Sequence, residues 1–291
     1  MKLTHRAHMA FGAQDGAFFG DYMFRFNADG RCRVFDARPL DSSAGEIAEL
    51  PLLTEFHTDP ADPVVPHFNA VVFGNEYYAP GDAFPLLYAN LYNNYAGAED
   101  RLEGTCCVYR LQKTGDTFAM TLVQVIRIGF VQDTLWRSAG DKPDVRPYGN
   151  FVIDTDRSLL HVFTMRDAEH VTRYFTFRLP KLAQGECSPF FGVPTVTLTK
   201  EDILSRFDTE YHLFIQGACC HEGKIYSSEG FNENIHPSLR VIDPAARKQL
   251  CHTDLVESGY TVEAEWIDFR NGICYYSDAH GNIYEADFML H

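Results

Sequence analysis

Short runs of Val, Ile, Phe and Tyr recur from one end of the chain to the other, and Gly, Asn and Asp separate each run from the next. Apolar runs of this length between turn residues are typical of β-strands. Helical signals are weak, and the best of them, 199–207, would make one or two turns. Aromatic residues make up 14% of the chain, and they suit half-buried strands. The hydrophobic pattern therefore predicts an all-β protein.

The strands group into a unit of strand, turn, strand and third strand, and this unit occurs five times. The clearest copy occupies 213–244, and the following copy, 262–288, matches it. Three earlier copies occupy 8–39, 67–113 and 149–180. A fourth strand follows most copies, at 46–53, 119–128, 194–199 and 247–255.

Repetition of this kind is the sequence form of β-propeller blades, which are small sheets standing around a central channel. We therefore predict an all-β, five-bladed β-propeller that forms a single domain over 1–291. A β-sandwich of hairpins does not explain why the strands align five times, and a sixth, divergent blade is the rival count. Because only seven residues precede His8 and three follow Phe288, the last blade is expected to have three strands. The expected blades are about 5–56, 64–130, 146–200, 211–257 and 261–291.

Polar residues stand at one register of the predicted inner strands, which are otherwise apolar. Side chains of a strand alternate between its faces, so residues two positions earlier share that face. We expect these two layers to line the mouth of the channel and to bind a polar small molecule. The alternative is that they satisfy one another and channel water. The first layer is His8, Asn69, Asn150, Gln216 and Glu265, and the second includes Arg6, His67, Tyr148 and Glu263.

Glu263 and Glu265 are the candidate catalytic residues if this site belongs to an enzyme. Glycoside hydrolysis uses two carboxyl groups about 5 to 10 Å apart. Five-bladed furanosidases take such acids from several blades, whereas the first three blades here carry His8, Asn69 and Asn150. The alternative for the two glutamates is ion pairing with Arg6 and a neighbouring histidine.

No metal site and no cofactor is predicted. The chain has neither a CxxC pair nor a compact group of zinc-type ligands. Ring closure would bring together, as the best alternative, His8, His67, Glu263 and Glu265. The nucleophile elbow of hydrolases and the phosphate-binding loops of nucleotide enzymes are absent from the sequence.

The chain is strongly acidic, with a net charge of −15 and a pI near 5.1. Phosphate backbones and anionic lipid would repel it, so no nucleic-acid and no membrane partner is expected, and a protein partner would be basic. No apolar run reaches the ~20 residues of a membrane-spanning helix. The vicinal pairs Cys106-Cys107 and Cys219-Cys220 are poorly placed to bridge on a strand. We therefore expect reduced cysteines and a soluble cytoplasmic protein, the alternative being an exported domain whose leader was removed.

One blade resembles a known family. Segment 214–243 is similar to a blade of the plant and bacterial type of glutaminyl cyclases, which are also five-bladed propellers. In that family an acidic residue directly follows the aromatic residue of the second strand, whereas here Glu229 comes two positions later. The resemblance implies the propeller fold and a cyclase-like transferase as one candidate activity. It rests on Phe214, Gln216-Gly217, Gly223, Ile225-Tyr226, Gly230 and Leu239-Arg240.

The leading functional expectation is recognition of a small polar ligand, a sugar or a peptide end, at the mouth of the channel. The first alternative is an enzyme in the same pocket, either a glycoside hydrolase or a glutaminyl-cyclase-like transferase. The second is a protein-interaction propeller that acts through its loops.

Overall fold

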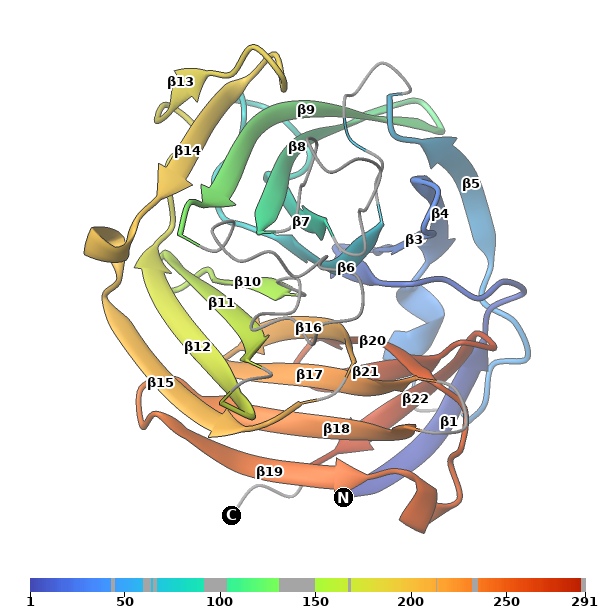
Figure 1. Cartoon of the computed structure of the whole chain (residues 1–291). Helices are drawn as coiled ribbons and strands as arrows, with labels where there is room; N and C mark the ends of the chain where they lie inside the picture. Colours follow the sequence, from blue (N-terminus) through green and yellow to red (C-terminus); the bar gives the residue numbers. More distant parts are fainter. Residues whose placement is uncertain are drawn as a thin grey trace.

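The structure is a computed structural model, and it shows five sheets arranged around a common centre (Figure 1). The prediction of an all-β, five-bladed β-propeller is confirmed. The structure describes residues 1–42, 45–59, 64, 67–91, 104–130, 150–166, 169–212, 214–231 and 235–288, with backbone alone at Asn150 and Arg166.

Each blade has four antiparallel strands that run outward from the centre, and the three inner strands are consecutive in the chain. Blade one contains β2 (Gly16–Phe19), β3 (Tyr22–Phe26), β4 (Arg31–Asp36) and β5 (Leu52–His57). Blade two contains β6 (Phe68–Phe73), β7 (Leu87–Leu91), β8 (Thr105–Thr114) and β9 (Thr117–Ile128), with β14 (Pro194–Leu198) and β13 (Glu186–Cys187) added outside. Blade three contains β10 (Asn150–Asp154), β11 (Leu159–Arg166), β12 (Val171–Arg178) and β15 (Ser205–Glu210).

Blades four and five complete the ring. Blade four contains β16 (Ile215–His221), β17 (Lys224–Phe231), β18 (Ile235–Asp243) and β19 (Lys248–Asp254). Blade five contains β20 (Ala264–Arg270), β21 (Ile273–Asp278), β22 (Asn282–Asp287) and β1 (Lys2–His8). The described part of the chain also contains the short 3₁₀ turns η1 (Arg38–Asp41), η2 (Lys200–Asp202) and η4 (Val256–Ser258).

The N-terminal strand closes the ring, which corrects two expectations. β1 pairs antiparallel with β22, from Lys2 opposite Asp287 to His8 opposite Asn282, so blade five has four strands and not three. His8 therefore ends an outer strand and does not begin the inner strand of blade one. Closure satisfies the edge that β22 would otherwise expose, and it buries Ala7 completely.

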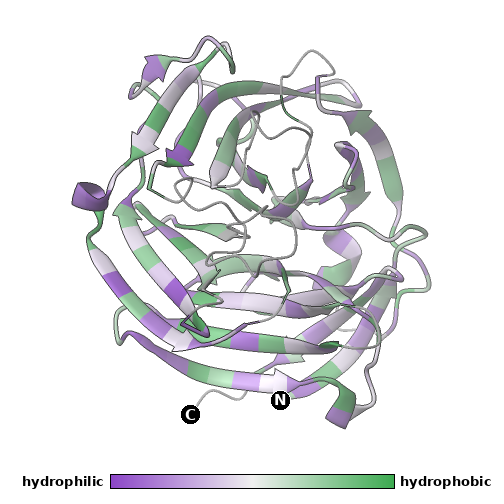
Figure 2. Ribbon diagram, in the orientation of Figure 1, coloured by the Kyte–Doolittle hydropathy of each residue, from purple (hydrophilic) through white to green (hydrophobic). Residues whose placement is uncertain are grey.

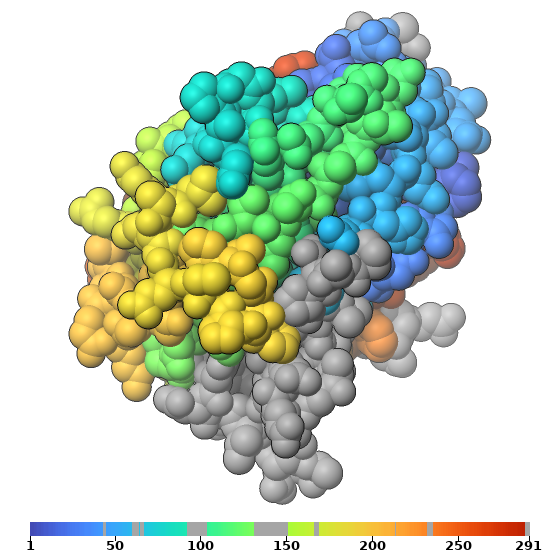
Figure 3. All heavy atoms as spheres, turned by 90° about the horizontal axis from the view of Figure 1, so that it is seen from above, coloured from blue at the N-terminus to red at the C-terminus, as the bar shows by residue number. Residues whose placement is uncertain are grey.

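The outer strands were predicted correctly in blades two and four and wrongly in blades one and three. In blade one the outer strand is β5, further along than 46–53. Segment 194–199, predicted as the outer strand of blade three, forms β14, which pairs parallel with β9 of blade two. Figure 3 shows this yellow segment beside the green strands of blade two. The apolar side chains of β14 pack against the core between blades two and three, which explains the placement.

The core lies between adjacent blades. β9 alternates exposed residues with buried Phe118, Met120 and Leu122, the pattern of a strand with one buried face. The ring of Phe24 lies 5.6 Å from that of Phe118 and 5.7 Å from that of Phe84, both edge to face. Figure 2 shows hydrophobic and hydrophilic residues alternating along β12. This inter-blade packing holds the inner strands in register around the centre.

The structure also bears on two further expectations, reduced cysteines and the absence of a membrane-spanning helix. All eight cysteines are free, and Cys187 is the exposed one. No helical segment within the described ranges has both the length and the hydropathy needed to cross a membrane.

Candidate functional site

Four described polar residues share one position near the start of the inner strands. In blades one, four and five the next residue lies opposite an equivalent partner on the second strand: Gly16 opposite Arg25, Gly217 opposite Ser228, and Trp266 opposite Ser277. The first layer therefore contains Asp15 where His8 was predicted. Its other described members are the predicted Asn69, Gln216 and Glu265.

Asp15 joins blades one and two. Its Oδ2 accepts a hydrogen bond of 2.7 Å from the backbone N–H of Val71, and its side chain is fully buried. Burial raises the pKa of Asp15 well above the usual range, although the backbone of Gly16 and the guanidinium of Arg25 oppose the shift. Within the described residues, Oδ1 has no hydrogen-bond partner.

Arg25 is a fully buried cation at the boundary of blades one and five. Its Nη1 donates to Ser277 Oγ at 2.8 Å, and its guanidinium lies 4.5 Å from the centre of the Trp266 ring. A Cβ at Gly16 would lie 2.8 Å from Cδ of Arg25 and 2.0 Å from the carbonyl oxygen of Phe24, so glycine is needed there. Burial lowers the pKa of Arg25 to about 10, while Asp15 and a glutamate of blade five favour its charged form.

Glu265 and Glu263 are neighbouring carboxyl groups with different surroundings. Glu265 is only 6% exposed, and burial, reinforced by the charge of Glu263 and opposed by Arg25, raises its pKa to about 9. At neutral pH Glu265 therefore carries a proton. The side chain of Gln216 donates to the carbonyl of Gly230 at 2.9 Å and also to Oε1 of Glu263, which orients that carboxylate.

Asn69 connects opposite sides of the ring. Its Nδ2 donates to the carbonyl oxygen of Ile215 at 2.5 Å, which joins the inner strands of blades two and four across the centre. The side chain of Asn90, fully buried on β7, accepts hydrogen bonds from the backbone N–H groups of Asn69 and Ala70. The ring at this level is thus held together by side chains.

A pocket of about 620 Å³ opens beside Glu263, on the side where the inner strands begin. It lies between the start of β18, the segment before β20 and the turn from β21 to β22, and His236, Thr261, Glu263 and His280 are among its lining residues. Its volume falls within the range of small-molecule sites. Glu263 is the link between this pocket and the buried layer below it.

Two predicted site residues lie away from the channel. Arg6 and His8 belong to the outer strand β1. Arg6 Nη1 pairs with Oε2 of Glu285 at 2.9 Å, not with Glu263 or Glu265. His8 Nδ1 lies 3.3 Å from Oδ1 of Asn282. The predicted convergence of His8 with the glutamates is therefore wrong, because β1 closes the ring from outside.

The remaining predicted residues lie around the site or outside the described chain. His67 precedes β6, and its Nε2 lies 2.8 Å from Oε1 of Gln14; burial lowers its pKa. Asn150 begins β10, as the register predicted, while its side chain lies outside the described residues. Tyr148 also lies outside them.

Asp15 and Arg25 were missed by the sequence reasoning. The signal for Asp15 was present: Asp15-Gly16-Ala17 matches Gln216-Gly217-Ala218, the start of the inner strand of blade four. Placing the first inner strand at His8 concealed this match. Arg25 gave no such signal, because an arginine on a second strand reads as a surface residue.

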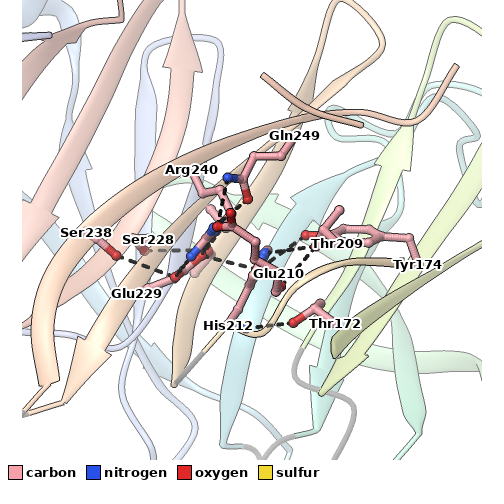
Figure 4. A network of polar contacts seen from close by, with 12 residues as sticks. Thr172, Tyr174, Thr209, Glu210, His212, Ser228, Glu229, Ser238, Arg240 and Gln249 are labelled. Carbon is pink, nitrogen blue, oxygen red and sulfur yellow. Dashed lines mark hydrogen bonds and ion pairs between the residues drawn. The ribbon is translucent and has the colours of Figure 1, made fainter. Parts of the chain in front are cut away.

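A second polar cluster lies between blades three and four (Figure 4). Glu229, the acid of the cyclase-like segment, is 3% exposed and accepts hydrogen bonds from Arg240 Nε at 2.7 Å and Nη2 at 3.0 Å. His212 Nδ1 lies 3.4 Å from Glu229 Oε1, and Thr209 Oγ1 lies 3.1 Å from His212 Nε2. Burial opposes ionisation of Glu229, but His212 and Arg240 bring its pKa below the usual value. The mutual pairing of these groups indicates a structural role.

No family model matches the chain, and no curated protein sequence matches it. Among solved structures, it is similar to a glutaminyl cyclase of Myxococcus xanthus, with 12% identity, a TM-score of 0.46, and coverage of 98% of this chain and 93% of that one. A putative oxidoreductase (glucose dehydrogenase) of Thermus thermophilus gives 10% identity, a TM-score of 0.48, and coverage of 98% and 99%. These similarities carry no argument about what this chain binds.

Proposed function

We propose that this protein recognises a small polar ligand at the mouth of the channel, and that the ligand presents an amino group, as a peptide end does, to Glu263. The observation that carries the proposal is the position of Glu263. Its carboxylate lies on the wall of a 620 Å³ pocket and is oriented from behind by Gln216. Fixed polar groups on the wall of a largely preformed pocket are the usual basis of small-molecule specificity.

The charges around the pocket favour an amino group over a neutral sugar. Of the described lining residues, Glu263 is the one acid, and none is Lys or Arg. The buried cation Arg25 contacts Ser277 and Trp266 and is not among the residues that line the pocket. An ammonium group would therefore meet an oriented carboxylate on the wall of the pocket and could form a charge-assisted hydrogen bond with it.

The test measures binding of a ligand panel by thermal shift and calorimetry. The panel contains short peptides with free amino ends, the same peptides with acetylated ends, and neutral monosaccharides. A ligand at a hundred times its dissociation constant stabilises the fold by about 2.7 kcal/mol. We expect binding of the free-ended peptides alone. Glu263→Gln should weaken this binding about 10- to 100-fold, because a hydrogen bond to a charged group is lost.

The matched control is Glu186→Gln, which removes one exposed acid from β13, remote from the pocket. It should bind as the unmodified protein does. Equal binding of acetylated and free peptides, or preferential binding of sugars, would contradict the amino-end proposal. Equal binding by Glu263→Gln would contradict the role of Glu263.

A second candidate function is acid catalysis in the same pocket. The observation that favours it is the buried Glu265, whose pKa is raised to about 9 by burial and by the neighbouring charge of Glu263, since a carboxyl group that keeps its proton at neutral pH can act as a general acid. Adding peptides that begin with glutamine to the panel and assaying the ammonia released on incubation distinguishes the two functions. Turnover that is lost in Glu265→Gln would favour the enzyme, and binding without turnover favours recognition.

A further inference from the structure

Three side chains with metal-binding donor atoms meet at the boundary of blades three and four. Asp154 ends β10, His161 lies on β11 and Cys220 lies near the end of β16. One donor atom from each lies within 4.8 Å of the other two. Asn150 and Gln216 stand at the start of these inner strands, so this cluster lies at the opposite end from the ligand pocket and is independent of the proposed function.

One ring nitrogen of His161 indicates that the cluster binds a further partner. The side chain is 3% exposed, and its Nδ1 lies 3.0 Å from Oγ1 of Thr176, directly across the sheet. Its Nε2 is buried and has no hydrogen-bond partner within the described part of the chain. Buried polar atoms without partners are uncommon and costly, and each requires an explanation. Burial lowers the pKa of His161 to about 4, so the imidazole is neutral and offers a lone pair.

Asp154 and Cys220 supply the other two donors. Asp154 is 3% exposed, and its Oδ2 lies 3.0 Å from Nη1 of Arg157, whose side chain is 56% exposed. Its Oδ1 accepts a hydrogen bond of 3.1 Å from the backbone N–H of Arg157. A carboxylate has about four acceptor positions, so these two contacts leave others available. Cys220 is half-buried, and burial raises the pKa of its thiol to about 12. Without a bound cation, this thiol keeps its proton.

We propose that Asp154, His161 and Cys220 bind a divalent transition metal, with Zn²⁺ as the best fit. Sulfur, imidazole and carboxylate together are the donor set that zinc accepts in tetrahedral sites. Three protein ligands leave the fourth position to water. On binding, Cys220 forms the sulfur–metal bond and releases its thiol proton to solvent, while Nε2 of His161 donates its lone pair and Asp154 one carboxylate oxygen. No electrons are transferred.

The geometry requires only a small closing motion. Zinc–ligand distances of about 2.0 to 2.3 Å imply about 3.3 to 3.8 Å between tetrahedral ligands, compared with the limit of 4.8 Å observed here. Cys220 belongs to a different blade from the other two, and its strand β16 packs against β10. Thr176 holds the imidazole by its other nitrogen, which is the usual arrangement for a metal-bound histidine. The metal would thus clamp two neighbouring blades.

The test uses the full chain under reducing conditions, titrated first with Co²⁺ and then with Zn²⁺. We expect one Co²⁺ per chain with a thiolate-to-cobalt absorption band, and displacement of the cobalt by Zn²⁺. Cys220→Ser and His161→Gln should each weaken zinc binding by more than about 100-fold, since loss of outer-shell partners alone costs about 10- to 100-fold. Cys251→Ser, which removes another half-buried cysteine outside the cluster, should bind as the unmodified chain does.

A second measurement avoids reliance on variants that could fold poorly. Alkylation of the unmodified chain followed by peptide mass spectrometry reports each cysteine separately. Zn²⁺ should protect Cys220 and leave Cys187 and Cys251 as reactive as before. Absence of stoichiometric binding, or binding that persists unchanged in Cys220→Ser and His161→Gln, would overturn the proposal, as would alkylation of Cys220 at an unchanged rate in the presence of zinc.

Discussion

At the scale of single residues, the centre of this propeller contains carboxyl groups whose charge depends on their depth. Asp15 and Glu265 are buried and Arg25 is the one described cation between them, so a single positive charge faces two acids. Burial makes the protonated form of Glu265 the stable one at neutral pH. The charge state of this layer is therefore a property of the folded ring and not of the free side chains.

Replacing Glu265 should change how stability depends on pH. The unfolded chain releases the Glu265 proton near pH 4.3, whereas the folded chain keeps it up to about pH 9. Between these values the folded state binds the extra proton, so this group makes the free energy of unfolding fall as pH rises. Glu265→Gln removes that dependence. Urea unfolding from pH 5 to pH 9 should show the variant gaining stability relative to the unmodified protein at each higher pH.

The control for this experiment is Glu257→Gln, an exposed acid on η4. The free energy of unfolding of this variant should change with pH in the same way as that of the unmodified protein between pH 5 and pH 9. A Glu265→Gln curve that also ran parallel would mean that Glu265 is ionised in the folded state.

The pair Glu229–Arg240 gives a second prediction at this scale. Arg240→Met leaves the carboxylate of Glu229 buried without its cation, which should cost about 3 to 5 kcal/mol of unfolding free energy. Arg173→Met breaks a pair with the half-exposed Asp208 and should cost no more than about 1 kcal/mol. Chemical denaturation measures both. Adding Glu229→Gln to Arg240→Met should recover part of the loss, and failure to recover it would mean that Arg240 acts through packing alone.

At the scale of elements, the strand that closes the ring, β1, was the hardest to predict from the sequence. Five repeats could be recognised because each inner hairpin carries its own apolar run and turn. The closing strand β1 has no such partner nearby, since its pairing residues on β22 lie about 280 positions away. Its short sequence, with Arg6 and His8 among apolar neighbours, suited an inner strand equally well.

Outer strands were predictable only where their own pattern was strong. β9 alternates clearly and was found. β15 (Ser205–Glu210) has few apolar residues, whereas the more apolar β14 (Pro194–Leu198) attracted the prediction. Which of the two pairs with β12 depends on tertiary packing and not on strand propensity.

Substitutions on the buried face of β1 should lower the stability of the closed ring more than substitutions on its exposed face. Ala7 is fully buried between blades one and five, so Ala7→Lys should cost about 3 kcal/mol or more by burying a charge. Thr4 is exposed opposite Glu285, so Thr4→Lys should change stability by no more than about 0.5 kcal/mol. Urea midpoints measure the difference. Equal midpoints for the two variants would show that β1 contributes little to holding the ring closed.

At the scale of the whole molecule, the fold could be predicted because repetition multiplies a weak signal. One hairpin with a polar residue at its start says little, but five in one register predict a ring and its polar layer. The same averaging explains the errors. An element that occurs once, such as β1 or the buried Arg25, adds nothing to a repeat pattern, so its place emerges only from packing. The shared register of Asn69, Gln216 and Glu265 could be predicted because these residues follow the repeat.

The pairing of β1 with β22 also sets how the ring would respond to mechanical force. Lys2, at the start of β1, lies opposite Asp287, at the end of β22. The residue before β1 and the residues after β22 therefore leave the paired strands at the same end. A pulling force applied through these two segments would load the hydrogen bonds between β1 and β22 one after another, instead of all together in shear. The ring would then open at this seam at low force, while the other blades, whose strands are joined by continuous chain, would stay folded.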